Sequence, residues 1–264
     1  MKSNILISRT GSNGDVLIAS AIVPAVREKH PGHPIYFATG CPQTLMHNPH
    51  IDYLVSPEAM LEDFEIHYKL DDVYENKPNV NILQAYADAA EVDIKKCKMY
   101  MMCDRVDMPL FTNYVVVHAG NTAWAGRNWI VKRWTEIALR LHDAGYQIIC
   151  VGDGYDKFVP SDTDVRNKTT VNQLATIIRD AKLFIGIDSL PFHIAQAVGT
   201  PGVVFFGSII PETRIINDNI KAITAKNLAC LGCHNRKPAP AFSTNDCEAG
   251  TLACEPDVSV DALL

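Results

Sequence analysis

The stretch Phe184-Ile-Gly-Ile-Asp-Ser-Leu-Pro-Phe-His-Ile-Ala-Gln-Ala-Val-Gly-Thr-Pro-Gly-Val-Val-Phe-Phe-Gly207 predicts a strand, a tight loop, a short helix and a second strand. The first apolar run stops at Asp188, Pro191 suits the first turn of a helix, and Gly199 suits its end. Two strands joined by a helix in this way run parallel. Their carboxyl edge, where α/β proteins bind ligands, is expected to hold three polar residues. These are Asp188, Ser189 and His193.

The composition is that of a soluble globular protein. The chain has 264 residues, of which 47% are hydrophobic and 20% are charged, enough for two modest domains. The net charge of −6 gives no general attraction to nucleic acid or to anionic membranes. No apolar run approaches the length of a signal peptide or a membrane span. We therefore expect a cytoplasmic protein without stable membrane insertion.

A strand, a glycine loop and a helix are expected at the start of the chain. The loop Arg9-Thr-Gly-Ser-Asn-Gly-Asp15 follows a short apolar run, and helical spacing then continues from Asp15 to Glu28. The glycine spacing fits neither a dinucleotide fingerprint nor a P-loop. Asp15 has two readings. It either complements the helix dipole only, or it lies at the end of the first strand as a carboxylate that takes a proton from a hydroxyl.

The alternation of strands and helices predicts two domains. Strands are expected at 34–39, near 51–55 and at 66–70, and the pattern restarts at 114–120 after a boundary near 108–112. We predict an amino-terminal domain at 1–110 and a carboxyl-terminal domain at 111–264. Both are expected to be doubly wound parallel sheets.

Four motifs occur in order along the chain. They are Ile7–Leu17, Val116–Gly120 with Lys132–Trp134, Gly186–Pro201 with Phe206-Gly207, and the tail from Cys230. Together they resemble glycosyltransferase family 9, the ADP-heptose:lipopolysaccharide heptosyltransferases and their relatives. The resemblance implies a GT-B architecture, in which two Rossmann-like domains face each other across a cleft. It also implies an enzyme that transfers a sugar with inversion, without a catalytic metal, from a nucleotide-diphosphate sugar to an acceptor hydroxyl.

The resemblance also implies roles for individual residues. Asp15 matches the family's proposed general base, in the amino-terminal domain. The loop near this base comprises Gly11, Ser12, Asn13 and Gly14. Helix N-termini, loop N–H groups and Lys132 would neutralise the departing diphosphate in place of a metal. The donor is expected to contact His118, Gly120, Asn121, Thr122, Lys132, Asp188, Ser189 and His193.

Several of these residues have a structural alternative. Asp188 would cap the short helix, and His193 would bond a loop carbonyl. Lys132 and Arg133 would be solvated residues before an amphipathic helix. Trp134 is predicted to lie in the core, because it shares a helical face with Ile137 and two further apolar residues.

Four cysteines crowd into the tail with the spacing C-x2-C-x13-C-x6-C. They are Cys230, Cys233, Cys247 and Cys254. This spacing suits a tetrahedral structural Zn²⁺ site, for which His234 is a substitute ligand, and the alternative is a set of reduced loop cysteines. Catalysis itself is expected to need no cofactor.

The chain departs from the family pattern in two ways. Leu190 stands where the family usually has glycine, and the chain is short for the family, mainly in the amino-terminal domain. The sugar is therefore heptose or another, and the acceptor is a saccharide or a hydroxylated nucleobase in DNA. A GT-B epimerase or hydrolase and a non-catalytic nucleotide-sugar binder stay open as alternatives. The expected location is the cytoplasm, with the periphery of the inner membrane as a variant.

Overall fold

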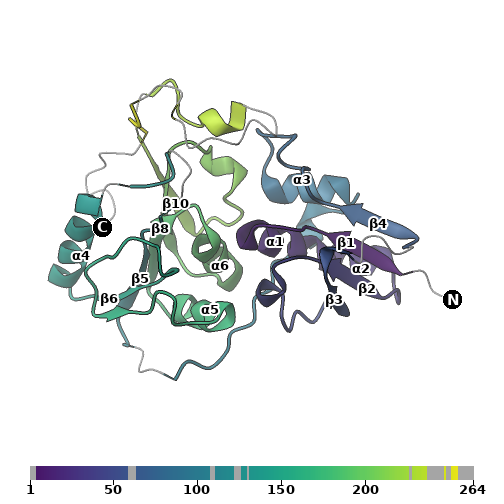
Figure 1. Ribbon diagram of the computed structural model, residues 1–264, viewed down its shortest axis with the longest axis horizontal. Coiled ribbons are helices and arrows are strands. Elements are labelled where there is room, and N and C mark those ends of the chain that lie inside the picture. Colours follow the sequence, from purple (N-terminus) through teal and green to yellow (C-terminus); the bar gives the residue numbers. More distant parts are fainter. Residues whose placement is uncertain are drawn as a thin grey trace. The chain divides into compact units, whose positions relative to one another are not determined.

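The chain folds into two compact units, Met1–Met102 and Cys103–Leu264. The computed structural model describes residues 4–58, 64–107, 111–121, 126–129, 131–225, 228–236, 247 and 251–254. Each unit is built around one parallel sheet with helices packed on it (Figure 1). The predicted α/β fold class is confirmed. No helix in the described ranges is long and apolar enough to cross a membrane.

The first unit contains a four-stranded sheet in the order β3-β2-β1-β4. Its strands are β1 (Ile5–Ser8), β2 (Ile35–Ala38), β3 (Tyr53–Val55) and β4 (Ile66–Lys69). Its helices are α1 (Asn13–Ala19), α2 (Val23–Lys29) and α3 (Ile82–Ala89), with 3₁₀ turns at Ser20–Ile22, Pro42–Thr44 and Ile94–Lys96. Strand β1 is buried along its whole length, since it lies between β2 and β4. The loop after β1 therefore starts from a fixed point.

The prediction of one continuous helix from Asp15 to Glu28 is wrong. The helix begins earlier, at Asn13, and is interrupted by the 3₁₀ turn at Ser20–Ile22. Pro24 explains the interruption, because it has no N–H to donate to the carbonyl of Ser20 and its ring would clash there. Asp15 consequently lies within the first turn of α1 rather than at its start.

The second unit contains a six-stranded sheet in the order β10-β9-β8-β5-β6-β7. Its strands are β5 (Tyr114–His118), β6 (Gln147–Cys150), β7 (Thr163–Asp164), β8 (Leu183–Ile187), β9 (Gly202–Phe206) and β10 (Ile220–Thr224). Its helices are α4 (Val131–Asp143), α5 (Val171–Arg179) and α6 (Leu190–Val198), with 3₁₀ turns at Pro211–Thr213 and Cys233–Arg236. The chain moves outward from β5 in both directions, which is the predicted doubly wound arrangement.

Helices cover both faces of this second sheet. Trp134 of α4 packs edge-on against Phe205, in a cluster with Val117 and other side chains of one face. The hydroxyl of Tyr114, which points to the opposite face, donates to the carbonyl of Ile177 in α5. Figure 1 shows α4 on one side of the sheet and α5 and α6 on the other. The predicted core position of Trp134 is confirmed, since its side chain is fully buried.

The stretch that opened the sequence analysis folds as β8, α6 and β9. Strands β8 and β9 pair in parallel, with Phe184 opposite Gly202. Pro191 lies in the first turn of α6, and Gly199 ends the helix with a φ of 80°. A left-handed end of this kind is a position that glycine occupies without strain. The carboxyl ends of β5, β8 and β9 thus meet at one edge of the sheet.

Candidate active site

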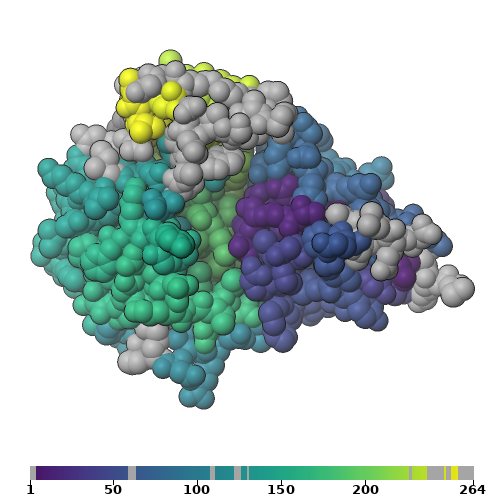
Figure 2. Space-filling model, in the orientation of Figure 1, coloured from purple at the N-terminus to yellow at the C-terminus, as the bar shows by residue number. Residues whose placement is uncertain are grey.

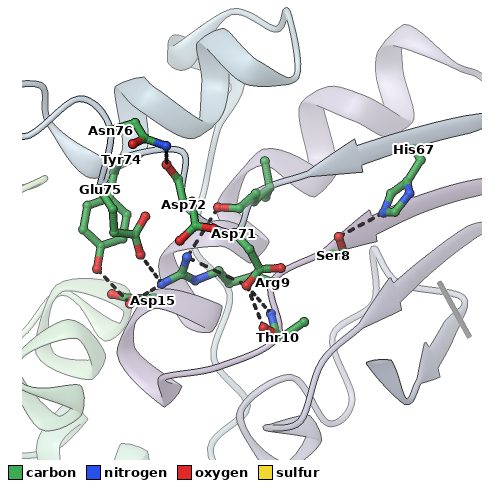
Figure 3. Close-up of polar contacts among 11 residues, drawn as sticks. Ser8, Arg9, Thr10, Asp15, His67, Asp71, Asp72, Tyr74, Glu75 and Asn76 are labelled. Atoms are coloured by element: carbon green, nitrogen blue, oxygen red, sulfur yellow. Dashed lines mark hydrogen bonds and ion pairs between the residues drawn. The ribbon is translucent and has the colours of Figure 1, made fainter. Parts of the chain in front are cut away.

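Arg9 and Asp15 form an ion pair at the carboxyl end of β1. The guanidinium of Arg9 donates from Nη2 to Asp15 Oδ2 at 2.7 Å and to Glu75 Oε1 at 2.7 Å. Tyr74 donates its hydroxyl to the same Asp15 Oδ2 at 3.0 Å. Figure 3 shows the guanidinium pointing toward both carboxylates. The predicted base is therefore held through one of its two oxygens, Oδ2.

The segment that follows β4 holds the glycine loop in place. Thr10 donates to Asp71 Oδ1 from its backbone N–H at 2.9 Å and from its hydroxyl at 2.7 Å. On the other side, Asn13 Oδ1 accepts from Gln43 and Thr44. The predicted loop residues lie around the base: Gly11 faces open space, Ser12 has a φ of 64°, Asn13 starts α1 and Gly14 is buried within it.

Burial makes this cluster electrostatically strong. The side chains of Arg9, Asp15 and Glu75 are only 8%, 15% and 15% exposed. Burial raises the pKa of the Glu75 carboxyl, while Arg9 acts against that rise. Burial alone would lower the pKa of Arg9, but the acidic groups around it, Tyr86, Asp15 and Glu75, raise it overall. Arg9 is consequently a permanent cation in this cluster.

Asp188 lies fully buried directly after β8. Its Oδ2 is 3.2 Å from Arg127 Nη2 and its Oδ1 is 3.5 Å from His193 Nε2. Burial alone would raise the pKa of Asp188, but Arg127, His193 and Arg214 hold it well below its usual value. The capping alternative is wrong, because Ser189 is the N-cap of α6 and no side chain caps that end. Asp188 is instead an ionised carboxylate among basic groups.

The chain after β9 brings Arg214 to this carboxylate. Gln196 of α6 accepts from the backbone N–H of Ile216 at 2.6 Å and donates to the carbonyl of Arg214 at 3.2 Å. Asn217 donates to the carbonyl of Gln196 at 2.6 Å. These bonds fix the buried Arg214 beside α6, which is why its charge reaches Asp188.

A second group gathers at the end of β5. His118 Nε2 is 3.1 Å from Asp156 Oδ2, which also accepts from the backbone N–H of Asp153. The N–H of Asn121 bonds the same carboxylate. Burial alone would raise the pKa of Asp156, but the bond to His118 lowers it. Asp156 thus holds two of the predicted donor residues, His118 and Asn121, in one arrangement.

Gly120 connects the two groups at the sheet edge. Its φ is 61°, and a Cβ at this position would lie 2.2 Å from Cδ1 of Ile187, the last residue of β8. Only glycine fits such a close approach in this conformation. His118 pairs with Gly186 across the two strands, so both groups occupy neighbouring strand ends.

The remaining predicted donor residues are not part of the bonded groups around Asp188 and Asp156. Lys132 is exposed in the first turn of α4, Ser189 is partly exposed at the start of α6, and Thr122 lies outside the described residues. Arg133 pairs with Glu136 at 2.6 Å on α4, and its side chain is only 24% exposed. Leu190, the departure from the family pattern, is the first residue of α6.

Sequence reasoning missed several charged and polar residues of these groups. They are Arg9, Asp71, Tyr74, Glu75, Arg127, Asp156 and Arg214. One signal for Asp71 to Glu75 was available, because this polar run follows β4 directly. The carboxyl ends of parallel strands meet at one edge, so the run had to lie near the loop that follows β1.

The tail cysteines lie near the same end of the second sheet. Cys254 is buried, and a Cβ on Gly126 or Gly207 would lie 2.7 or 3.2 Å from its sulfur. Burial, followed by the thiols of Cys233, Cys247 and Cys230, raises the pKa of Cys254 to about 11. Figure 2 shows the described tail residues as a yellow surface patch. Within the described ranges, no three His, Cys, Asp or Glu side chains are arranged to hold a metal ion.

Comparison with known proteins identifies the family. A model of glycosyltransferase family 9 (heptosyltransferase) matches residues 56–240, more than half of the chain. The chain belongs to glycosyltransferase family 9. The resemblance predicted from the four motifs is thereby confirmed.

Two curated relatives of this family 9 chain are lipopolysaccharide heptosyltransferase 3 proteins of Escherichia coli. One is 32% identical over 109 residues, which cover 36% of this chain and 32% of the relative. The other, from strain K12, is 27% identical over 141 residues, which cover 49% of this chain and 41% of the relative. The match thus spans well under half the length of these relatives.

Solved structures show the fold of this family 9 chain. The iron-containing dodecameric glycosyltransferase TibC from enterotoxigenic E. coli has a TM-score of 0.72 at 17% identity, covering 89% of this chain and 65% of that chain. ADP-heptose lps heptosyltransferase II of E. coli has a TM-score of 0.70 at 13% identity, covering 85% and 91%. The predicted GT-B fold is confirmed.

Proposed function

We propose that this protein is an inverting glycosyltransferase that moves a sugar from a nucleotide-diphosphate donor to an acceptor hydroxyl. The observation that carries the proposal is the anchored carboxylate of Asp15. Arg9 and Tyr74 both bond its Oδ2, and no hydrogen bond to Oδ1 is recorded among the described residues. An anchored carboxylate with one oxygen available is what a general base for a hydroxyl requires.

The reaction proceeds by a single displacement. Asp15 Oδ1 accepts the proton of the acceptor hydroxyl while the acceptor oxygen forms a bond to the anomeric carbon. The bond from that carbon to the diphosphate oxygen breaks, and its electron pair leaves with the nucleoside diphosphate. Attack from the face opposite to the leaving group inverts the anomeric configuration.

We assign donor binding to the second unit and the base to the first. Arg127 and Arg214 bring positive charge to the start of α6, and Lys132 adds a further cation on α4. Cations and helix N–H groups stabilise a developing diphosphate charge, which is the task a divalent metal ion performs in other enzymes. The remaining described residues that we assign to the donor site are His118, Gly120, Asn121, Asp188, Ser189 and His193.

ADP-heptose is the donor that we propose first. A neighbour in structure, TibC, is described in complex with ADP-D-β-D-heptose, and the curated relatives are named as heptosyltransferases. We propose a saccharide hydroxyl as acceptor, on the same support from the relatives named for lipopolysaccharide. A saccharide of that kind would place the protein at the periphery of the inner membrane.

We also propose a structural metal ion in the tail, held by Cys230, Cys233, Cys247 and Cys254. Burial, followed by the other three thiols, raises the pKa of Cys254, and the backbone N–H of Leu252 donates to Cys247 Sγ at 3.3 Å. A tetrahedral metal ion would bind these four sulfurs as thiolates, and sulfur ligands of this kind suit Zn²⁺ or iron. The neighbour TibC is described as iron-containing.

The proposed function is tested by donor binding followed by turnover. A thermal-shift series with ADP-heptose, UDP-glucose and GDP-mannose should raise the melting temperature for ADP-heptose, because a ligand of the native state stabilises it. Incubation with ADP-heptose and a heptose-deficient core saccharide should then yield ADP and a glycoside of inverted anomeric configuration, read by NMR. Release of ADP at the same rate without acceptor would indicate hydrolysis, and retained configuration would contradict the mechanism.

A further inference from the structure

The loop after β6 is built around the carboxylate of Asp156. Gly152 has a φ of 139°, and a Cβ there would lie 2.1 Å from Asp156 Oδ2, so only glycine admits the carboxylate at this place. Asp153 donates its backbone N–H to that oxygen at 2.8 Å, and its own Oδ1 accepts the backbone N–H of Asp156 at 3.1 Å. The guanidinium of Arg166, which bonds both oxygens of Asp164, also donates to the carbonyl of Asp156. The position of this carboxylate is therefore fixed from several sides.

The same carboxylate bonds two residues of the loop after β5. Its Oδ2 lies 3.1 Å from Nε2 of His118, and the backbone N–H of Asn121 bonds the carboxylate as well. The next residue in the chain, Lys157, donates its backbone N–H to the carbonyl of Gly120 at 3.2 Å. The loops after β5 and β6 are thus joined at His118, Gly120 and Asn121, three of the residues that we assign to the donor site.

The ring of His118 depends on Asp156 for its orientation. The bond to His118 lowers the pKa of Asp156 against the effect of burial, and an ionised carboxylate only accepts hydrogen bonds, so Nε2 carries hydrogen. Nδ1 of the same ring is buried and has no hydrogen-bond partner among the described residues. The hydrogen bond of one ring nitrogen determines which of the two is protonated. Within the described chain, Asp156 therefore sets both the tautomer and the orientation of His118.

We propose that Asp156 is a positioning residue for the nucleotide-sugar donor, because it holds His118 and Asn121 in the arrangement that the donor binds. This inference rests on the proposed donor site in the second unit. Asp156 acts through these two residues and does not touch the donor itself. Binding to a site that is already ordered avoids the cost of ordering side chains and loops. Loss of the carboxylate should therefore weaken binding of the donor rather than slow the chemical step.

A second histidine–aspartate pair supplies a matched control. Asp162 Oδ2 lies 2.9 Å from Nε2 of His142 and accepts the backbone N–H of Ile148 at 2.7 Å. This pair lies near the amino end of β6, whereas His118 lies at the carboxyl end of the neighbouring strand β5. Asp162 thus makes the same kinds of bond as Asp156, but away from the residues assigned to the donor.

The test compares Asp156→Ala with Asp156→Asn in the full chain. Calorimetry with ADP-heptose should show about tenfold weaker binding by Asp156→Ala, because His118 and the loop must then be ordered on binding. Asp156→Asn keeps an oxygen that accepts from His118, so its loss should be about threefold, since a neutral amide bonds more weakly than a carboxylate. For both variants kcat at saturating donor should stay near the wild-type value. Asp162→Ala and Asp162→Asn should bind the donor as the wild type does.

A measurement on the free protein separates this inference from the proposed function. ¹⁵N NMR should find the neutral ring of His118, identified by its absence from His118→Phe, with hydrogen on Nε2 in the wild type and with both tautomers in Asp156→Ala. Unchanged donor binding in the Asp156 variants, equal losses in the Asp162 variants, or an unchanged ring in Asp156→Ala overturns the role of Asp156. If Asp156→Ala does not fold, Asp156→Asn against Asp162→Asn decides in the same way. Wild-type protein that binds neither ADP-heptose nor ADP instead overturns the proposed donor site, and with it this role.

Discussion

The Nη2 of Arg9 lies 2.7 Å from Oδ2 of Asp15, and this bond joins the two ends of the loop that follows β1. Arg9 directly follows the buried strand, and Asp15 lies in the first turn of α1. Both ends are therefore anchored on regular elements, while Asp71 holds Thr10 between them. A carboxylate that is held in this way needs little reorganisation before it accepts a proton.

Replacement of the proposed base tests this arrangement directly. Asp15→Asn should lower kcat by at least ~100-fold, because general base catalysis contributes at least that factor. Binding of the donor, measured by calorimetry with ADP-heptose, should be unchanged. Asp72→Asn is the matched control, since Asp72 is an exposed carboxylate in the same cluster and its φ of 61° is one that asparagine tolerates. Equal losses of kcat in Asp15→Asn and Asp72→Asn would contradict the role of Asp15 as the general base.

The arrangement of elements could be predicted because each part of it has a local signal. The stretch from Phe184 to Gly207 carries apolar runs, a helix-starting proline and a helix-ending glycine, and all of them act within a few residues. Pro24 is also a local signal for the interruption of the first helix. We nevertheless predicted one continuous helix, because the helical spacing of the apolar residues continues past this proline. Asp15 could be singled out because it follows a strand and a glycine loop.

The partners of the site residues could not be predicted in the same way. Glu75 is 66 residues from Arg9, and their contact depends on β4 pairing in parallel with β1. The choice between capping and ion pairing for Asp188 depended on Arg127, which lies in an irregular loop. Such contacts follow from the sheet order, which local spacing does not determine.

Replacing Gly120 by alanine should destabilise the fold more than the same change at a glycine that also has a positive φ but no close neighbour. Gly120→Ala should lower the free energy of unfolding by about 3 kcal/mol, through left-handed strain and a clash with Ile187 Cδ1. Gly145→Ala should cost about 1 kcal/mol, because its φ is 83° but nothing lies within 4 Å. Urea unfolding of both variants measures the difference. Adding Ile187→Val, which removes Cδ1, should recover part of the loss at Gly120, and no recovery would contradict the clash.

The ion pairs of Asp188 should make stability depend on pH. Its pKa in the folded protein is depressed from 3.8, so its contribution is full above that value and is lost as the pH falls further. Asp188→Asn should cost about 3 kcal/mol at pH 7, because it leaves buried cations uncompensated. Urea unfolding should show this cost shrinking below about pH 3.8. Asp180→Asn, which breaks the exposed pair with Arg179, should cost under about 1 kcal/mol, and a cost at Asp188 that does not change with pH would contradict the assignment.

The proposed metal site predicts a stoichiometry and a specific loss. Purified protein should contain about one equivalent of zinc or iron by mass spectrometry, since four thiolates complete one tetrahedral site. Cys254→Ser should remove the metal and lower the melting temperature, because a metal that binds only the native state stabilises it. Cys97→Ser is the control, since this partly buried thiol lies in the first unit, outside the tail. The tail cysteines are not ligands if protein prepared without chelators contains no metal. The same conclusion follows if Cys254→Ser and Cys97→Ser lose equal amounts of metal.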